Sequence, residues 1–437
     1  MLTTLKNAWV IPELRKKILF TLMIVVAFRL GSVIPTPFLD SVALEQLMGS
    51  LDESTALSYV NMLTGGAFSY ATIFALGISP YINSSIIMNL LTVAIPALER
   101  LSKEGETGRK KIAMITRFAT VGLALAMGIG YFTYLSSSGV TLYSEGPAYW
   151  FSAVVIVLSF TAGSALIMWM GEQINENGVG NGISIILFSG IVATLPVYGG
   201  TLVSYFAMGI QDPSTYWHYF ILVPLFVILF LGIIWLIIFM NESERRIPIQ
   251  YAKKMVGRKM YGGQSSHMPI KVAMSGVMPV IFASAILSIP STIELFTGSI
   301  DTGFWGAVFD ALQAGGWIYI ILYFFLILIF AYFYMSIQYN PIEMANNLRQ
   351  SNGTIPGIRP GRPTSEFIAR ILNKVTLIGA LFLAVIALVP LIYGNLTGMT
   401  SLSIGGTSII IMVGVALETV KQIESQMMMR NYKGFLD

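Results

Sequence analysis

The chain consists largely of separate apolar runs of about 20 residues, joined by short polar segments. A run of this length forms an α-helix that crosses the ~30 Å hydrocarbon core of a bilayer. Only 11% of the residues are charged, whereas soluble domains carry roughly 25%. Continuous apolar runs also favour helices over a membrane β-barrel, whose strands show only weak alternation. The sequence therefore predicts an all-α, polytopic membrane protein.

Ten membrane-spanning helices are expected, in two halves of five at residues 18–200 and 201–420, between an interfacial N-terminus (1–17) and a cytoplasmic tail (421–437). An odd number of spans per half means that related halves have inverted topologies, an arrangement that builds a path at their interface. The spans centre on residues 18–35, 74–96, 113–135, 150–170, 182–197, 218–240, 272–293, 316–338, 374–393 and 404–420.

With this threading, every Lys and Arg except Arg29 lies on one side of the membrane. Short cytoplasmic loops retain basic residues, so both termini are expected in the cytoplasm of a bacterial cell, and the protein in its inner membrane. Arg29 lies inside the first span, and the sequence gives no role for it. The near-absence of charge in the spans argues against ion-coupled or acid–base chemistry there.

Two spans in corresponding places of the two halves are interrupted by Gly and Pro. Gly77 and Pro80 interrupt the second span, and Gly276 and Pro279 interrupt the seventh. Matched interruptions are a sequence pointer to a central site, although Gly and Pro are also generally frequent in membrane helices. Pro80 is expected to kink its helix, because its ring clashes with the carbonyl four residues earlier.

The segment 61–73, NMLTGGAFSYATI, is too polar and glycine-rich to face lipid. Irregular backbone at membrane depth persists only inside protein or beside a water-filled cavity. We expect a short helix over 67–73 that lies inside the bundle as a lid or re-entrant piece, with an external surface loop as the alternative. Ile78 and Ile82, four residues apart, share a helix face and belong either to ordinary core or to an apolar ring that gates a pore by dewetting.

Seven stretches, in order along the chain, resemble the SecY family of bacterial protein-conducting channels. They are FALGISPYINSSI (74–86), EGETGRKK (104–111), GEQINENGVGNGISIILFSGIV (171–192), RRIPIQYAKK (245–254), GVMPVIFASAI (276–286), NPIEMANNLRQSNGTIPGIRPGRPT (340–364) and GGTSIII (405–411). The resemblance implies a channel between two inverted halves that passes unfolded polypeptide across the membrane.

The resemblance also assigns residues to the channel. A short plug precedes the second span, at Met62, Leu63, Thr64, Gly65, Gly66, Ala67, Phe68, Ser69, Tyr70, Ala71 and Thr72. An apolar constriction falls on Ile78, Ile82, Leu187, Met274, Met278 and Ile411, with Val277 and Ile281 near enough to compete for the two Met positions. The family opens sideways between the second and seventh spans, where a polar seam is expected at Asn83, Ser84, Ser85, Ser284 and Ser288.

Two cytoplasmic loops, 241–271 and 339–371, are longer and more basic than connectors need to be. Retention by the membrane potential and attraction to anionic lipids explain their charge but not their length. The resemblance implies that they dock the SecA motor ATPase and the ribosome, whose RNA would add phosphate contacts, with Arg359 most closely tied to motor-driven transport. The other implied partners are SecE, SecG, signal peptides and the nascent polypeptide. The expected docking residues are Arg245, Arg246, Lys253, Lys254, Arg258, Lys259, Arg349, Arg359 and Arg362.

Several functional classes are disfavoured by what the sequence lacks. There is no GxxxxGK[ST] phosphate loop, no HExxH and no GxSxG motif, so an enzyme or intramembrane protease is not expected. With no Cys, neither disulfides nor thiolate–metal sites are possible, and no cofactor is expected. A secondary transporter shares inverted repeats and broken helices, but its midplane ionisable groups have no clear counterpart beyond Arg29 and Glu418. A non-conducting scaffold is disfavoured by the plug-like segment.

Overall fold

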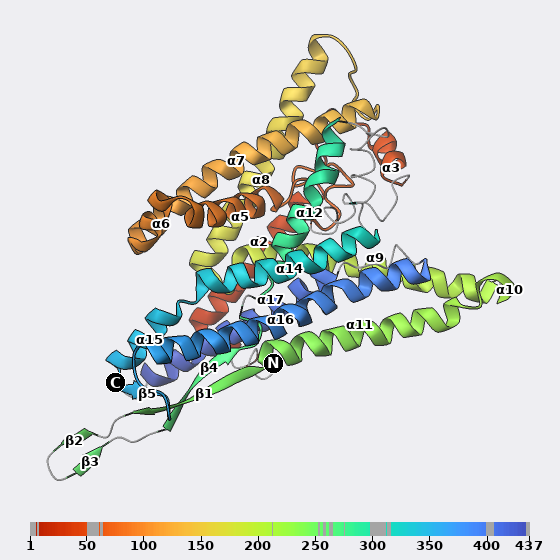
Figure 1. Ribbon diagram of the computed structural model, residues 1–437. Coiled ribbons are helices and arrows are strands. Elements are labelled where there is room, and N and C mark those ends of the chain that lie inside the picture. The colour runs from red at the N-terminus through yellow and green to blue at the C-terminus, as the bar shows by residue number, and fades with distance from the viewer. Residues whose placement is uncertain are drawn as a thin grey trace.

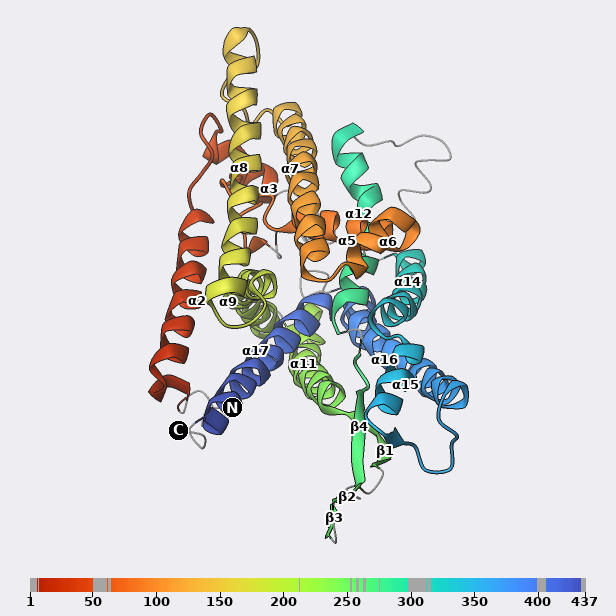
Figure 2. The ribbon, with the colours of Figure 1, turned by 90° about the vertical axis from the view of Figure 1, so that its left-hand side faces the viewer.

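The computed structural model describes residues 6, 8–49, 61, 64–211, 213–251, 254–256, 259–261, 265–274, 276–297, 312, 316–398 and 406–433 of the chain. Over these residues the fold is a bundle of long helices, with a small β-structure projecting from one end (Figure 1). Figure 2 shows that α2 starts and α17 finishes at the end of the bundle where the strands lie.

The long regular elements described in the N-terminal half are helices, joined by turns and two isolated β-bridges. These helices are α2 (Pro12–Gly31), α3 (Ser41–Gly49), α5 (Ser79–Ala94), α6 (Pro96–Lys103), α7 (Glu106–Ser137), α8 (Pro147–Asn177) and α9 (Gly182–Gln211). Helix α7 packs against α5 and α8, and α2 packs against α8 and α9. The chain bends by 100° between α5 and α6, at Pro96, which has no amide hydrogen to continue the preceding helix.

The C-terminal half contains α10 (Pro213–Tyr216), α11 (Tyr219–Glu242), α12 (Met278–Thr297), α14 (Trp317–Gln338), α15 (Pro341–Gln350), α16 (Arg362–Thr397) and α17 (Gly406–Lys433). Helices α12, α14 and α16 pack in sequence, and α17 contacts α11 and α16. The halves meet where α9 contacts α11 and α17, and where α7 contacts α12.

Each of the ten predicted spans coincides with one helix of the described residues, namely α2, α5, α7, α8, α9, α11, α12, α14, α16 and α17. Seven described helices are long and apolar enough to cross a membrane alone, or eight when the bent pair α5–α6 is one span. Helix α2 carries Arg15, Lys16 and Lys17 in its first turns, and the apolar part of α12 extends only over Met278–Pro290. The mostly helical, polytopic fold expected from the sequence is confirmed.

The first of the two long basic loops, 241–271, forms a β-structure that the sequence does not predict. Strand β1 (Glu244–Tyr251) pairs antiparallel with β4 (Ser265–Lys271), and its far end pairs with β5 (Gly353–Thr354) from the second loop. Strands β2 (Lys254–Val256) and β3 (Lys259–Tyr261) extend this hairpin. Ile247 and Ile249 alternate with exposed neighbours on β1 and are buried, as expected for a strand with one covered face.

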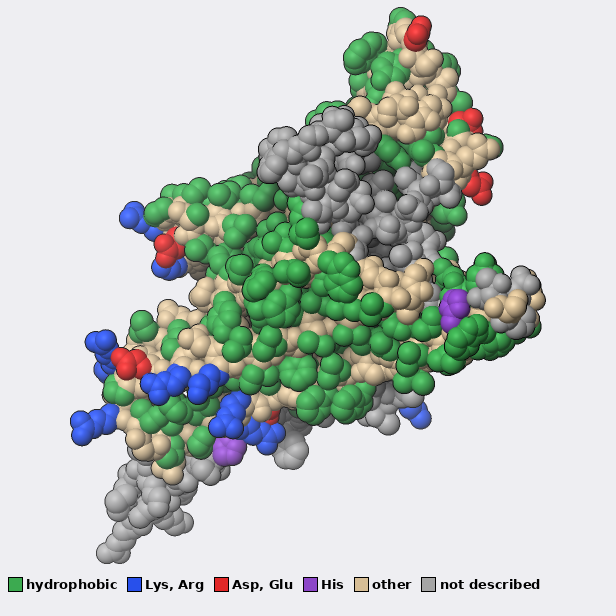
Figure 3. All heavy atoms as spheres, turned by 45° about the vertical axis from the view of Figure 1, so that its right-hand side comes forward, with side chains coloured by type: hydrophobic (Ala, Val, Ile, Leu, Met, Phe, Trp, Pro, Cys, Tyr) green, Lys and Arg blue, Asp and Glu red, His purple; other side chains and the backbone are tan. Residues whose placement is uncertain are grey.

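Five apolar clusters form the core of the described residues. The largest lies mainly among α11, α12, α14, α16 and α17 of the C-terminal half and also includes Ile86 of α5. A second joins both halves at the centre of the bundle, and a third packs the segment before α5 against α7 and α8. The fourth lies beneath the β-hairpin, where Met274 contacts side chains of β1, α15 and α16. Elsewhere apolar side chains cover much of the outer surface (Figure 3), as expected for a protein whose solvent is lipid.

Candidate functional site

Helices α5 and α12 each begin after a break with the same pattern, Gly-x-x-Pro. Gly77 has φ +55° and Gly276 has φ +58°, a region that glycine enters without steric cost. The amide of Gly77 donates a hydrogen bond to the Phe74 carbonyl (2.8 Å), and that of Gly276 donates to the Ala273 carbonyl (3.2 Å). The two predicted interruptions therefore have equivalent backbone geometry.

The proline in each pattern starts its helix instead of kinking it. We expected Pro80 to bend a helix already formed, but α5 begins at Ser79 and Pro80 occupies its first turn, where the missing amide hydrogen has no cost. The first full helical bonds run from Ile82 to the Ile78 carbonyl (3.1 Å) and from Ile281 to the Val277 carbonyl (3.2 Å). Ile78 thus corresponds to Val277, and Ile82 to Ile281.

The segment 64–78 lies inside the N-terminal half, and the described residues after Thr64 form turns where we expected a short helix over 67–73. Local bonds compete with the helix: the Thr64 hydroxyl accepts from the Phe68 amide (3.2 Å), and the Thr72 amide and hydroxyl both donate to the Ala67 carbonyl (3.1 and 3.2 Å). Such side-chain bonds favour turns over helix. Of the expected plug, Met62 and Leu63 lie outside the described residues, whereas Gly65, Gly66, Ser69, Tyr70 and Ala71 belong to these turns.

Surrounding helices hold this segment at several points. The Phe68 ring stacks on Tyr131 of α7 (centroids 4.3 Å apart), and the Tyr131 hydroxyl donates to the Phe68 carbonyl (2.7 Å). On α8, the Ser164 hydroxyl donates to the Gly77 carbonyl (3.1 Å). Phe74 stacks on Phe28 of α2 (5.8 Å). The alternative of an external surface loop is therefore wrong for 64–78.

An apolar cluster joins both halves directly beside this segment. Ile78, Leu187 and Ile411 are 4%, 4% and 2% exposed and belong to it, and Ile82 packs against it. These side chains come from the break before α5, from α5 itself, from α9 and from α17. The structure thus brings together four of the six residues that the resemblance assigns to the constriction.

The two Met residues assigned to the constriction lie elsewhere. Met274 belongs to the cluster beneath the β-hairpin, and Met278 is 38% exposed. Val277 and Ile281, the competing residues of the same stretch, pack against the central cluster. The repeated Gly-x-x-Pro pattern identifies these residues from the sequence, because it aligns Val277 with Ile78 and Ile281 with Ile82.

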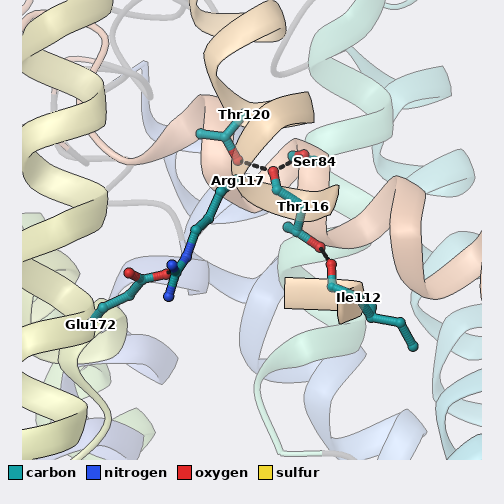
Figure 4. A network of polar contacts seen from close by, with 6 residues as sticks. All are labelled: Ser84, Ile112, Thr116, Arg117, Thr120 and Glu172. Atoms are coloured by element: carbon teal, nitrogen blue, oxygen red, sulfur yellow. Dashed lines mark hydrogen bonds and ion pairs between the residues drawn. The ribbon is translucent and has the colours of Figure 1, made fainter. Parts of the chain in front are cut away.

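The serines of the expected lateral seam make hydrogen bonds from α5 to α7 and within α12. The Ser84 hydroxyl donates to the Thr116 carbonyl of α7 (3.0 Å), within the N-terminal half (Figure 4). The Ser284 and Ser288 hydroxyls donate to carbonyls of their own helix, at Ile281 (2.9 Å) and Ala285 (2.8 Å). Asn83 and Ser85 are partly exposed on α5.

An ion pair next to this seam links α7 to α8. Arg117 Nε lies 2.6 Å from Glu172 Oε1 (Figure 4). The pair gives Glu172 of α8 a basic partner on the neighbouring helix. Both side chains are partly exposed, so the pair adds little free energy to the contact between the two helices.

The docking residues that the structure describes lie on the exposed surface around the β-hairpin, at Arg245, Arg246, Arg349, Arg359 and Arg362. Arg246 pairs with Glu244 (2.6 Å) and Arg362 with Glu366 (3.0 Å). Lys254 and Lys259 belong to β2 and β3, and Lys253 and Arg258 lie outside the described residues. In Figure 3 most Lys and Arg side chains in view gather at one end of the molecule and most acids at the other.

The SecY family model matches residues 72–420. The protein translocase subunits SecY of Streptomyces scabiei and Streptomyces coelicolor are 44% and 45% identical to this chain, each over 100% of both sequences. The chain belongs to the SecY family. As a SecY family member it is the multi-pass, protein-conducting channel subunit of a bacterial translocase, and not an enzyme.

Solved structures agree with this SecY fold. One of a protein-conducting channel has a TM-score of 0.64 at 16% identity, covering 94% of this chain and 92% of that chain. Sec61 in the canine ribosome–channel complex has a TM-score of 0.60 at 15% identity, with the same coverage. At these identities the likeness concerns the fold alone.

Proposed function

We propose that polypeptide passes between the two halves through a ring of Ile78, Ile82, Leu187, Val277, Ile281 and Ile411. The observation that carries this proposal is the central apolar cluster, to which α5, α9, α12 and α17 contribute from both halves. Apolar side chains close a narrow pore to ions by excluding water, yet bind a passing chain only weakly. The ring therefore acts as a seal that polypeptide opens.

The segment 62–72 is the plug that supports this seal, and Ala67, among its described residues, belongs to the same apolar cluster as the ring. In the open state it leaves its place among α2, α7 and α8. Its turns suit that movement, because fewer regular hydrogen bonds must break than in a helix.

Apolar segments leave sideways between α5 and α12, the second and seventh spans, at the seam expected from Asn83, Ser84, Ser85, Ser284 and Ser288. Polar contacts between membrane helices contribute only about 0.6 kcal/mol on average. A gate closed by such contacts opens readily when a signal peptide offers apolar surface instead.

The basic end of the molecule faces the cytoplasm together with both termini, and its two β-linked loops dock the partners that supply polypeptide and energy. SecA and the ribosome are the expected partners, and two solved relatives of this fold are ribosome-bound complexes. SecE, SecG and anionic lipids are expected against the apolar outer surface and its basic rim. Arg359→Glu is expected to abolish motor-driven transport while leaving ion sealing intact; unchanged transport would contradict this assignment.

The ring assignment is tested by crosslinking to a stalled polypeptide. The chain has no Cys, so single cysteines at each ring position can form disulfides only with a cysteine placed in the stalled chain. We expect crosslinks from positions 82, 277, 281 and 411, and none from Met274→Cys, the matched control. Crosslinks at 274 without any at 277 or 281 would contradict the proposed path.

A further inference from the structure

Arg29 is the one basic residue outside the cytoplasmic side of the predicted topology, and the function above does not use it. It lies in the last turn of α2 and is partly buried. Its Nη1 donates to the Gly65 carbonyl (3.3 Å), and its Nη2 donates to the carbonyls of Ser189 and Gly190 (3.2 Å to Gly190). The guanidinium therefore joins the segment 64–78 to helix α9.

The acceptors are backbone carbonyls of these two elements. Among the described residues, the ion pairs join other side chains, and none includes Arg29. A cation in an apolar interior is tolerated only when dipoles or charges satisfy it. The planar fork of Arg has five donors and reaches several carbonyls at once, which Lys cannot do.

The position of Gly65 depends on this contact. A Cβ added there would lie 2.6 Å from Arg29 Nη1 and 3.0 Å from the Gly190 carbonyl oxygen. Gly65 also has φ +66°, which a side chain would strain. The backbone of the segment is thus as close to the guanidinium and to α9 as a residue without a side chain allows.

The contact lies next to the proposed ring. Ser189 and Gly190 follow Leu187 on α9 and precede Ile191, and both of these apolar residues belong to the central cluster. Phe28, the neighbour of Arg29, stacks on Phe74 of the segment. A movement of the segment away from α9 therefore breaks the Arg29 contact at the same place where it uncovers the ring.

We propose that Arg29 is a positioning residue that latches the plug to α9 in the closed channel. This inference rests on the proposed function, since it requires 64–72 to be the plug. Displacement of the plug by a polypeptide separates Gly65 from the guanidinium, and water entering the open path hydrates the cation in its place. The charge is then satisfied in both states, by carbonyls when closed and by water when open.

The test uses the absence of native thiols. Arg29→Cys in the translocase assembled with its membrane partners is reconstituted into planar bilayers, and ion conductance is measured without polypeptide substrate. We expect the resting conductance to rise by about tenfold, as for the loss of a strong charged hydrogen bond. Treatment with aminoethyl methanethiosulfonate, which attaches an ammonium group through a disulfide, is expected to lower it again; propyl methanethiosulfonate, neutral and similar in size, is not.

Controls separate the latch from a packing role and from the plug itself. Arg15→Cys, an exposed position on the same helix, is expected to conduct as the unmodified chain does, with either reagent. Equal restoration by the neutral reagent, or no rise in Arg29→Cys, overturns the latch. A channel with residues 65–70 deleted is expected to leak ions. If it leaks but the Arg29→Cys channel stays sealed, the latch is refuted and the plug assignment stands. If the deletion does not leak, the plug assignment itself is refuted.

Arg29→Lys covers the case in which the Cys variant does not assemble. It keeps the charge but loses the fork, so the resting conductance is expected to rise less than on deletion of the plug. The melting temperature of the assembled complex is expected to stay near that of the unmodified chain. A conductance equal to that of the unmodified channel would contradict the latch here as well.

Discussion

The breaks before α5 and α12 have the same backbone geometry but different surroundings. A Cβ added at Gly77 would lie 2.6 Å from Thr64 Cγ2, whereas one added at Gly276 would meet nothing within 4 Å. Ile78 is 4% exposed, while its counterpart Val277 is partly exposed and the next residue, Met278, is 38% exposed. The break at Gly77 is enclosed by packing, and the break at Gly276 is more open.

The same Gly-x-x-Pro break therefore has different surroundings in the two halves, and we infer a different role for each. In the N-terminal half the break is enclosed by the segment after Thr64 and by α2, α7 and α8, which suits the sealing role proposed for it. In the C-terminal half the backbone at Gly276 has open space beside it, whereas the next residue, Val277, packs against the central cluster. Four sets of substitutions test the contrast.

The largest effect is expected from valine at the two glycines. Gly77→Val adds a clash with Thr64 to the cost of positive φ and should lower the free energy of unfolding by about 3 kcal/mol. Gly276→Val has only the cost of φ, about 1.5 kcal/mol. Thermal unfolding in detergent measures both, with Gly122→Val on α7, which has open space and no positive φ, as control. Equal losses at 77 and 276 would contradict the contrast in packing.

The ring residues test whether the breaks are equivalent in function. Ile82→Gly and Ile281→Gly each remove an apolar side chain of the central cluster, at a cost of about 2–3 kcal/mol. Both should raise the resting ion conductance of the reconstituted channel by similar factors. Met278→Gly, three residues before Ile281 and exposed, is the control and should leave it unchanged. A leak in Met278→Gly with a sealed Ile281→Gly would restore the first ring assignment.

A smaller effect is expected at the Tyr131 hydroxyl. Tyr131→Phe leaves the Phe68 carbonyl without this donor, which costs about 1–1.5 kcal/mol and loosens only the enclosed half. Resting conductance should rise several-fold less than in Ile82→Gly. Tyr134→Phe on the same helix serves as control. Unchanged conductance in Tyr131→Phe would mean that the stacked rings alone hold the segment.

The smallest effect is expected at the ion pairs. Glu172→Gln removes the pair with Arg117 that links α7 to α8, at a cost of at most about 1 kcal/mol. Glu366→Gln removes an exposed pair within α16, with a cost of about 0.3 kcal/mol. Because the side chains are exposed, high salt should reduce both differences. Thermal unfolding at low and high salt measures them, and a larger loss at Glu366 would contradict the bracing role of Glu172.

The sequence was sufficient for the architecture because span length and charge are set by the bilayer. Each predicted span coincides with a helix, since a run of apolar residues has no other way to satisfy its backbone in lipid. The positions of Gly77 and Gly276 were also predictable, because their pattern repeats in both halves.

The sequence was insufficient where local and tertiary bonds compete. The turns of 64–78 depend on hydrogen bonds of the Thr64 and Thr72 hydroxyls. Residue propensities do not show that these bonds favour turns over a helix here. Pro80 lacks an amide hydrogen whether it starts a helix or kinks one, so the residue alone does not distinguish the two. The break at Gly77 makes Pro80 a helix start. Ile247 and Ile249 give β1 a period of two, but the run is short and lies in a loop whose charge obscured the pattern.

The cluster beneath the β-hairpin joins the two long basic loops into one structural unit. Strand β1 pairs with β4 of its own loop and with β5 of the other, so a load on either loop reaches α11, α14 and α16 together. Shortly after β4 the chain reaches Met274, a buried member of that cluster, and two residues later Gly276, the break before α12. Met274 therefore anchors the short stretch between the β-structure and α12, and a displacement of either loop is expected to reach α12 through this residue.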